Sequence, residues 1–160
     1  MLSILLLDDE PNLLCARSRT LRSQLDTVVR VETCSDPHEA LARVGAHDFD
    51  VIVADRDMAP MNGIEFLHCA RALQPEALRL LVVTSSEIGG STAAIDELGV
   101  FRCIIEPWSA ERLVEDVRAA LAQAVASRAE RELAAAVRAA SGRVGGSHDA
   151  APRIDELLRK

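Results

Sequence analysis

Acidic residues stand at the ends of two short apolar runs of the sequence. The run "LSILLLDD" closes on Asp8 and Asp9, and "FDVIVAD" closes on Asp55, with Asp57 two residues later. Carboxylates that gather without a cation repel one another, and a divalent cation with oxygen ligands relieves that repulsion. These residues therefore predict a Mg²⁺ site, with Mn²⁺ as an alternative, that could neutralise an incoming phosphoryl group and leave one carboxylate as nucleophile.

Two further polar residues follow apolar runs later in the chain. "LRLLVVT" ends on Thr84, whose hydroxyl could hydrogen-bond a phosphoryl oxygen. "VFRCIIEPW" places Glu106 directly before Pro107 and Trp108, so that a carboxylate ends an otherwise buried run. The meaning of Glu106 depends on what else gathers at that end of the predicted sheet.

The elements that must position these residues alternate regularly. Short apolar runs predict strands, and amphipathic stretches between them predict helices. Such alternation is typical of an α/β fold, here a doubly wound five-stranded parallel sheet with helices on both faces. The expected strands are residues 2–8, 28–34, 49–55, 78–84 and 100–105, and the expected helices between them are 11–25, 36–45, 63–73 and 91–99.

Ligands of doubly wound sheets bind beyond the carboxyl ends of the strands, where the strand order reverses. In a sheet of order 2-1-3-4-5, the first and third strands are neighbours. Asp8, Asp9 and Asp55 are therefore expected to converge in one pocket, with Thr84 on the adjacent strand.

The last third of the chain differs in composition. Residues 109–140 contain no Gly or Pro and predict an extended C-terminal helix, whereas residues 141–152 are rich in Gly and Ser. The expected organisation is a domain over 1–125, a helical extension over 126–140 and a flexible tail over 141–160. An apolar stripe interrupted by polar residues leaves a coiled coil, a solvated extension and a signalling helix as alternatives. The stripe consists of Leu113, Val117, Leu121, Val125, Leu133 and Val137.

Composition narrows the functional class. The net charge of −7 argues against a nucleic-acid-binding surface, and the four cysteines include no CxxC pair that would suggest a metal cage. No leader is expected, and no apolar run approaches the roughly 20 residues that span a bilayer. We therefore expect a cytoplasmic protein that has reduced thiols and binds neither nucleic acid nor membrane.

Four segments together resemble the receiver domain of bacterial two-component response regulators over about residues 1–125. They are "LLLDDEPN", "VIVADRDMAPMNG", "LLVVTSSE" and "IIEPW". The resemblance implies that Asp55 is the phosphoacceptor, that Asp8 and Asp9 bind Mg²⁺ together with the main-chain carbonyl of Asp57, and that Thr84 is the switch hydroxyl. It also implies a signalling domain whose partner is a histidine kinase or phosphotransfer protein. The only catalysis expected is its own phosphotransfer and dephosphorylation.

The chain departs from this family at two positions of the fifth strand. The family normally has Lys, which pairs with the phosphoacceptor, where this chain has Glu106, and it often has an aromatic residue where this chain has Cys103. The exchange at Glu106 alters the local charge by two units, which should raise carboxylate pKa values in the metal-free pocket. Arg56 or Arg102 could supply the missing cation, or Glu106 could turn to solvent.

Other functions remain open at this level. A degenerate receiver could act as a phosphorylation-independent interaction or dimerisation module, with a homodimer formed through the C-terminal helix or the last receiver helix. A flavodoxin-like electron carrier would need a phosphate loop and aromatic rings, but the chain has "DDEPN" after the first strand and no Tyr. A phosphatase with an acidic α/β site would need a cap or positive residue that does not follow that motif.

Overall fold

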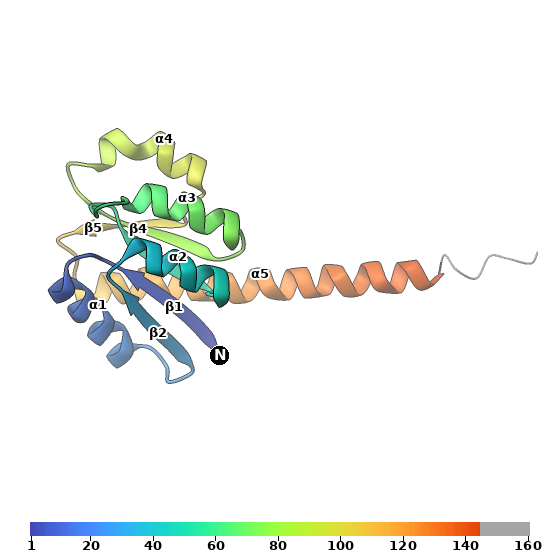
Figure 1. Cartoon of the computed structure of the whole chain (residues 1–160). Helices are drawn as coiled ribbons and strands as arrows, with labels where there is room; N and C mark the ends of the chain where they lie inside the picture. The colour runs from blue at the N-terminus through green and yellow to red at the C-terminus, as the bar shows by residue number, and fades with distance from the viewer. Residues whose placement is uncertain (145–160) are drawn as a thin grey trace, which may run out of the picture. The chain divides into compact units, whose positions relative to one another are not determined.

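The computed structural model describes residues 1–144, although the side chains of residues 90, 91, 94, 143 and 144 are not described. Strands and helices alternate along the chain (Figure 1), as the sequence pattern predicts. In order, they are β1 (Leu2–Leu7), α1 (Pro11–Gln24), β2 (Val29–Cys34), α2 (Pro37–Ala46), β3 (Val51–Asp55), α3 (Gly63–Leu73), β4 (Leu78–Thr84), α4 (Ile88–Leu98), β5 (Arg102–Glu106) and α5 (Ala110–Val144).

The five strands form one parallel sheet in the order β2-β1-β3-β4-β5, which confirms the predicted fold class. The first strand pairs with β2 on one side and β3 on the other, and Leu7 lies opposite both Cys34 and Ala54. In the β4–β5 pair, Thr84 lies opposite Glu106. The carboxyl ends of β1, β3, β4 and β5 therefore lie along one edge of the sheet.

Helices cover both faces of the sheet because alternate residues of each buried strand point to opposite sides. Ile4 and Leu6 of β1 belong to a core that includes residues of α1 and α5. Leu5 and Leu7 belong to a second core with residues of α2 and α3. Parallel strands buried on both faces in this way read as continuous apolar runs, which is why "LSILLL" shows no alternation.

The helices depart from their predicted bounds at two places. α4 begins at Ile88 rather than residue 91, although Gly89 and Gly90 lower the helix propensity there. α5 continues to Val144 rather than ending at residue 140. Gly142 lies within its last turn, so residues 141–144 are helix rather than the start of the predicted tail. The rest of that tail, residues 145–160, lies outside the described residues.

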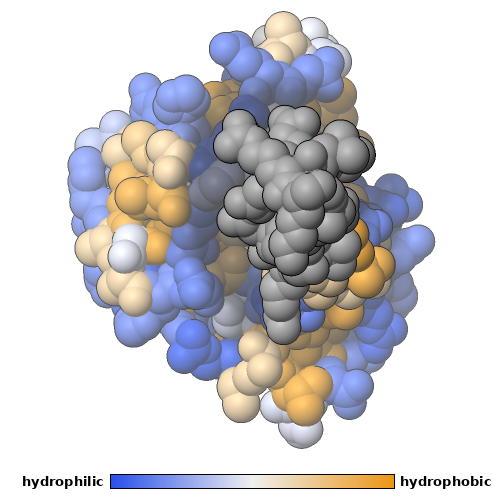
Figure 2. All heavy atoms as spheres, turned by 90° about the vertical axis from the view of Figure 1, so that its right-hand side faces the viewer, coloured by the Kyte–Doolittle hydropathy of each residue, from blue (hydrophilic) through white to orange (hydrophobic). Residues whose placement is uncertain are grey.

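The chain separates into two units, one from Met1 to Ala124 and one that begins at Val125. In the first, Leu113, Val117 and Leu121 of α5 belong to the core. In the second, Leu133 and Val137 are exposed. On the face drawn in Figure 2, the described residues show hydrophilic side chains interspersed with separate apolar patches. No helix within residues 1–144 is long and apolar enough to cross a membrane.

Candidate functional site

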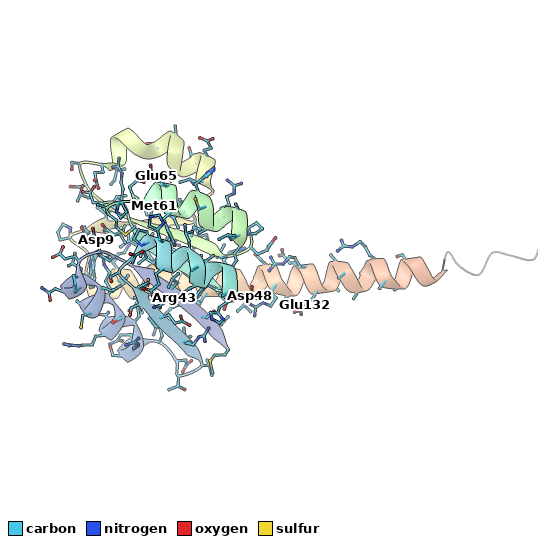
Figure 3. The ribbon with its side chains drawn as sticks, viewed as in Figure 1. Asp9, Arg43, Asp48, Met61, Glu65 and Glu132 are labelled. Carbon is cyan, nitrogen blue, oxygen red and sulfur yellow. The ribbon has the colours of Figure 1, made fainter. Side chains whose placement is uncertain are left out.

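The residues singled out by the sequence meet at the carboxyl edge of the sheet around a cavity of about 190 Å³. Its lining includes Asp8, Asp9, Asp55, Asp57, Thr84 and Glu106, and we call this cavity the acidic pocket. Figure 3 shows Asp9 at the end of the domain where β1 finishes, far from Asp48, which precedes β3. The structure thus brings all six predicted site residues to one cavity.

The backbone around Asp55 is held by the tight turn between β3 and α3. Gly63 packs directly against it, since a Cβ at this position would lie 2.1 Å from the Asp55 carbonyl oxygen. Asn62 caps α3 by accepting a hydrogen bond from the Glu65 N–H at 2.9 Å, and the Glu65 carboxylate accepts one from the Asn62 N–H at 3.1 Å. This capping box fixes where α3 begins and so fixes the loop that follows Asp55.

A buried arginine, which the sequence interpretation did not identify, lies beneath the acidic pocket. Arg17 comes from α1, and its side chain is 2% exposed. Its Nη1 donates to Asp8 Oδ2, its Nη2 donates to Glu106 Oε1, and Nη2 also lies 3.8 Å from Asp55 Oδ1. Burying a guanidinium is costly unless it is paired, and here three carboxylates share it.

Two further contacts of Arg17 matter for the site. Its guanidinium carbon lies 6.0 Å from the centre of the Trp108 ring, at the limit of a cation–π contact. Its Nε–H has no hydrogen-bond acceptor among the described residues although the atom is buried. Arg17 is therefore held at its two terminal nitrogens and keeps one unused donor.

Negative charge still exceeds positive charge around Asp55. Burial raises the pKa of the Asp55 carboxyl from 3.8 to about 7, and the charges of Asp8 and Glu106 act in the same direction. Arg17 and the Asp57 N–H, which donates to Asp55 Oδ2 at 3.1 Å, lower that pKa but do not offset the rise. The pocket thus favours any added positive charge next to Asp55.

The donor set of the acidic pocket fits an oxygen-preferring divalent cation, because the polar side chains that line it are carboxylates and one hydroxyl. The excess negative charge at Asp55 supports the same conclusion. However, residues 1–144 contain no group of three or more Asp, Glu, His or Cys side chains already arranged to hold a metal ion. Both oxygens of Asp8 are engaged, Oδ2 by Arg17 and Oδ1 by the Glu10 N–H at 2.8 Å.

Thr84 lies at the rim of the pocket and is only partly buried. Its hydroxyl lies 3.1 Å from the Ser86 hydroxyl, and its backbone N–H donates to Glu87 Oε2 at 2.7 Å. That backbone hydrogen bond lowers the pKa of Glu87. The Thr84 hydroxyl thus contacts another rotatable hydroxyl, and such a contact can be exchanged readily.

The structure answers the question of which cation replaces the expected Lys. Arg56 pairs with Glu87 at 3.5 Å, and Arg102 pairs with Asp116 at 2.8 Å. Among the described residues, the arginine that forms an ion pair with Asp55 is Arg17. Glu106 does not turn fully to solvent but contacts Arg17, with its side chain 25% exposed. Cys103, where the sequence comparison with the family led us to expect an aromatic residue, is partly buried against the α2–α3 core.

A signal for Arg17 was present in the sequence. Buried positions of α1 include Leu14, Arg17 and Leu21, spaced three and four residues apart, which places an arginine on the apolar face of the helix. An arginine on such a face needs a buried acidic partner. The sequence pattern could not show that its partners lie 9 and 89 residues away, after β1 and at the end of β5.

Comparison with known proteins places this geometry in a family. Residues 4–118 match the model of the response regulator receiver domain. The chain is 32% identical over 120 residues to the hydrogenase transcriptional regulatory protein HoxA of Cupriavidus necator, covering 74% of this chain and 24% of the relative. It is 30% identical over 118 residues to the C4-dicarboxylate transport transcriptional regulatory protein DctD of Rhizobium meliloti, covering 74% and 25%.

Solved structures share the fold of this chain. A structure titled as an adenylate cyclase from Rhodopirellula baltica aligns with a TM-score of 0.75 at 30% identity, covering 82% of this chain and 95% of the other. A response regulator receiver domain protein from Clostridium thermocellum shares the fold, with a TM-score of 0.68 at 22% identity, covering 77% and 96%.

The chain spans about a quarter of the length of these two regulators, and the matched segment is a signalling domain. The family model covers most of the sheet, both core faces and every residue of the acidic pocket. The chain belongs to the response regulator receiver domains of two-component systems.

Proposed function

We propose that Asp55 accepts a phosphoryl group from the phosphohistidine of a histidine kinase or phosphotransfer protein. The observation that carries this proposal is the position of Asp55 at the end of central strand β3, in the acidic pocket between Asp8 and Glu106. A carboxylate oxygen of Asp55 attacks phosphorus while the bond from phosphorus to the donor imidazole nitrogen breaks. The electron pair of that bond stays with the imidazole, and the phosphoryl group is joined to Asp55.

The chain's own residues orient the acceptor. The Asp57 N–H donates to Asp55 Oδ2, which limits rotation of the carboxylate. Arg17 lies next to Asp55 Oδ1 and favours its ionised form. The Thr84 hydroxyl can exchange Ser86 for a phosphoryl oxygen. These contacts position the nucleophile and provide a donor for the product.

We propose that Mg²⁺, with Mn²⁺ as an alternative, is bound by Asp9, Asp55 and the main-chain carbonyl of Asp57, with Asp8 assisting from beneath. When bound, the ion supplies positive charge that offsets both the carboxylates and the incoming phosphoryl group. The carboxylates that line the pocket and the raised pKa of Asp55 support this assignment.

Intact-mass spectrometry after incubation with Mg²⁺ and acetyl phosphate tests the acceptor. We expect the mass of one added phosphoryl group on the full chain and none on Asp55→Ala. Asp57→Asn is the matched control, because only the main chain of Asp57 is assigned a role, and it should still be phosphorylated. A wild-type chain that gains no phosphoryl group, or an Asp55→Ala chain that does, would contradict the proposal and favour a phosphorylation-independent interaction module.

For the domain organisation, we propose a receiver over residues 1–125 and a helical extension over 126–140 through which two copies associate. Supporting this proposal, Val125, Leu133 and Val137 of α5 are large apolar side chains exposed by 49%, 66% and 56%. Sedimentation velocity should show a dimer for the full chain and a monomer for Leu133→Glu. The matched control Glu132→Ala, at an adjacent exposed position, should remain dimeric.

A further inference from the structure

We propose that Arg17 and Glu106 form an exchangeable ion pair that connects the phosphorylation state of Asp55 to the turn after β5. In this arrangement Arg17 is a positioning residue that provides, from α1, the positive charge that the family normally provides from β5. When Asp55 carries a phosphoryl group, Nη2 of Arg17 moves its contact from Glu106 to a phosphoryl oxygen, and Glu106 is released toward solvent. This inference rests on the proposed phosphorylation of Asp55.

The geometry of Nη2 is the first support. This nitrogen contacts Glu106 Oε1 and lies 3.8 Å from Asp55 Oδ1, so it already stands between two carboxylates. A small shift exchanges one acceptor for the other. Nη1 remains on Asp8, which holds the guanidinium in place during the exchange.

Charge and shape give the direction of the exchange. Phosphorylation replaces the single charge of the Asp55 carboxylate with a phosphoryl group of higher charge and three acceptor oxygens. With Nη1 kept on Asp8, the planar guanidinium can still bind such a group through two donors, Nη2 and the unpartnered Nε–H. The phosphoryl group therefore competes with Glu106 for Arg17 and also repels the Glu106 carboxylate.

Exposure indicates which partner leaves. The side chains of Arg17 and Asp8 are each 2% exposed, whereas that of Glu106 is 25% exposed. Glu106 can regain water with little rearrangement, but the other two cannot. Release at Glu106 is thus the response that the packing permits.

The turn after β5 would receive the signal. Glu106 ends β5 and is followed by Pro107 and by Trp108, which packs against the α1–α5 core and lies near Arg17. Glu106 also lies opposite Thr84, the predicted switch residue, in the β4–β5 pair. A change at Glu106 is therefore placed to alter the surface formed by the ends of β4 and β5.

Trp108 provides the measurement, because it is the only tryptophan of the chain. The full chain is titrated with beryllofluoride in the presence of Mg²⁺ as a phosphoryl mimic. Occupancy is followed by ¹⁹F NMR, and the environment of Trp108 is followed separately by its fluorescence. We expect wild-type protein to bind the mimic and to change its Trp108 emission in proportion to occupancy.

The Glu106→Gln variant is the decisive test, because the Glu106 side chain is partly exposed and its replacement should preserve the fold. This substitution removes the carboxylate that competes for Arg17. We therefore expect the mimic to bind about tenfold more tightly, which corresponds to about 1.4 kcal/mol of binding free energy. We also expect a smaller change in Trp108 emission. Arg17→Lys keeps the charge without the planar donor pair and should bind the mimic more weakly while keeping part of the response. Arg19→Lys, an exposed site on the same helix, is the matched control and should behave as wild type.

The outcomes separate the inference from the function on which it rests. Failure of wild-type protein to bind the mimic would overturn both the acceptor role of Asp55 and the exchange. Normal binding by wild type together with unchanged affinity and emission in Glu106→Gln would overturn the exchange alone. A tighter mimic complex with a reduced Trp108 response supports it.

Discussion

Two arginines are buried in this receiver domain, one at each end of the sheet, and their surroundings differ. Arg17 lies at the carboxyl edge among the carboxylates of Asp8, Asp55 and Glu106. Arg79 is at the start of β4, 7% exposed, and donates to the carbonyl oxygens of Ala77 at 2.7 Å, Pro75 at 3.2 Å and Gly99 at 3.4 Å. The buried arginine at the carboxyl edge of the sheet thus has charged partners, whereas the buried arginine at the opposite edge has neutral partners.

This difference indicates that Arg17 belongs to the functional site, whereas Arg79 has a structural role. Burial lowers the pKa of Arg79, and its carbonyl partners tie down the loops before β4 and after α4 without titrating. Arg17 instead sits among more negative charge than it can neutralise, because one guanidinium faces three carboxylates. An ion pair with competing acceptors can be rearranged by a new anion, whereas three carbonyl contacts only hold the chain in place.

The largest expected effect comes from Arg17→Met. Removing the guanidinium leaves buried carboxylates unpaired, which should lower the free energy of unfolding by about 3–5 kcal/mol at pH 8. The loss should be smaller at pH 5, because Asp55, with a pKa of about 7, is then protonated. Urea unfolding in EDTA at the two pH values measures this, and an equal loss at both would contradict the electrostatic role of Arg17.

A gain of stability is expected for Asp55→Asn. The folded protein raises the pKa of Asp55 from 3.8 to about 7, so the unfolded chain ionises first and stability falls as pH rises through that window. Removing the charge should therefore stabilise the metal-free protein by about 2–4 kcal/mol at pH 8 and have almost no effect at pH 4. Saturating Mg²⁺ should reduce the gain, because the ion stabilises the wild-type carboxylate. If the variant is less stable than wild type at pH 8, the ionised Asp55 carboxylate does not destabilise the folded protein.

The smallest expected effect is that of Arg79→Met. Loss of its carbonyl contacts should cost about 1–3 kcal/mol, with the same value at pH 5 and pH 8 because its hydrogen-bond acceptors do not titrate. The same urea measurements serve, and phosphorylation of Asp55 should persist in any folded fraction. A strongly pH-dependent loss would remove the distinction between the two arginines.

Sequence patterns predicted the strands of the sheet and the polar residues at their carboxyl ends. An apolar run and the residue that ends it are local features of the sequence, so no folded geometry was needed to find them. Apolar runs ending in Asp8 and Asp55 identified neighbouring strand ends, and Thr84 and Glu106 fell in register on the next pair. The start of α4 was predicted three residues too late, because Gly89 has a low helix propensity although it lies within the helix. The partners of Arg17 could not be predicted, because an ion pair across 89 residues depends on the folded geometry.

The spacing of the Arg17–Glu106 pair also limits how this domain can be recombined with its relatives. Arg17 belongs to the first helix and Glu106 to the last strand, so any chimera joined between them inherits only one member of the pair. A hybrid with this N-terminal half and a last strand that carries the Lys expected at this position would hold two cations in one pocket. The reciprocal hybrid would hold Glu106 without Arg17 to pair with it. Functional chimeras of this receiver should therefore require α1 and β5 to be exchanged together.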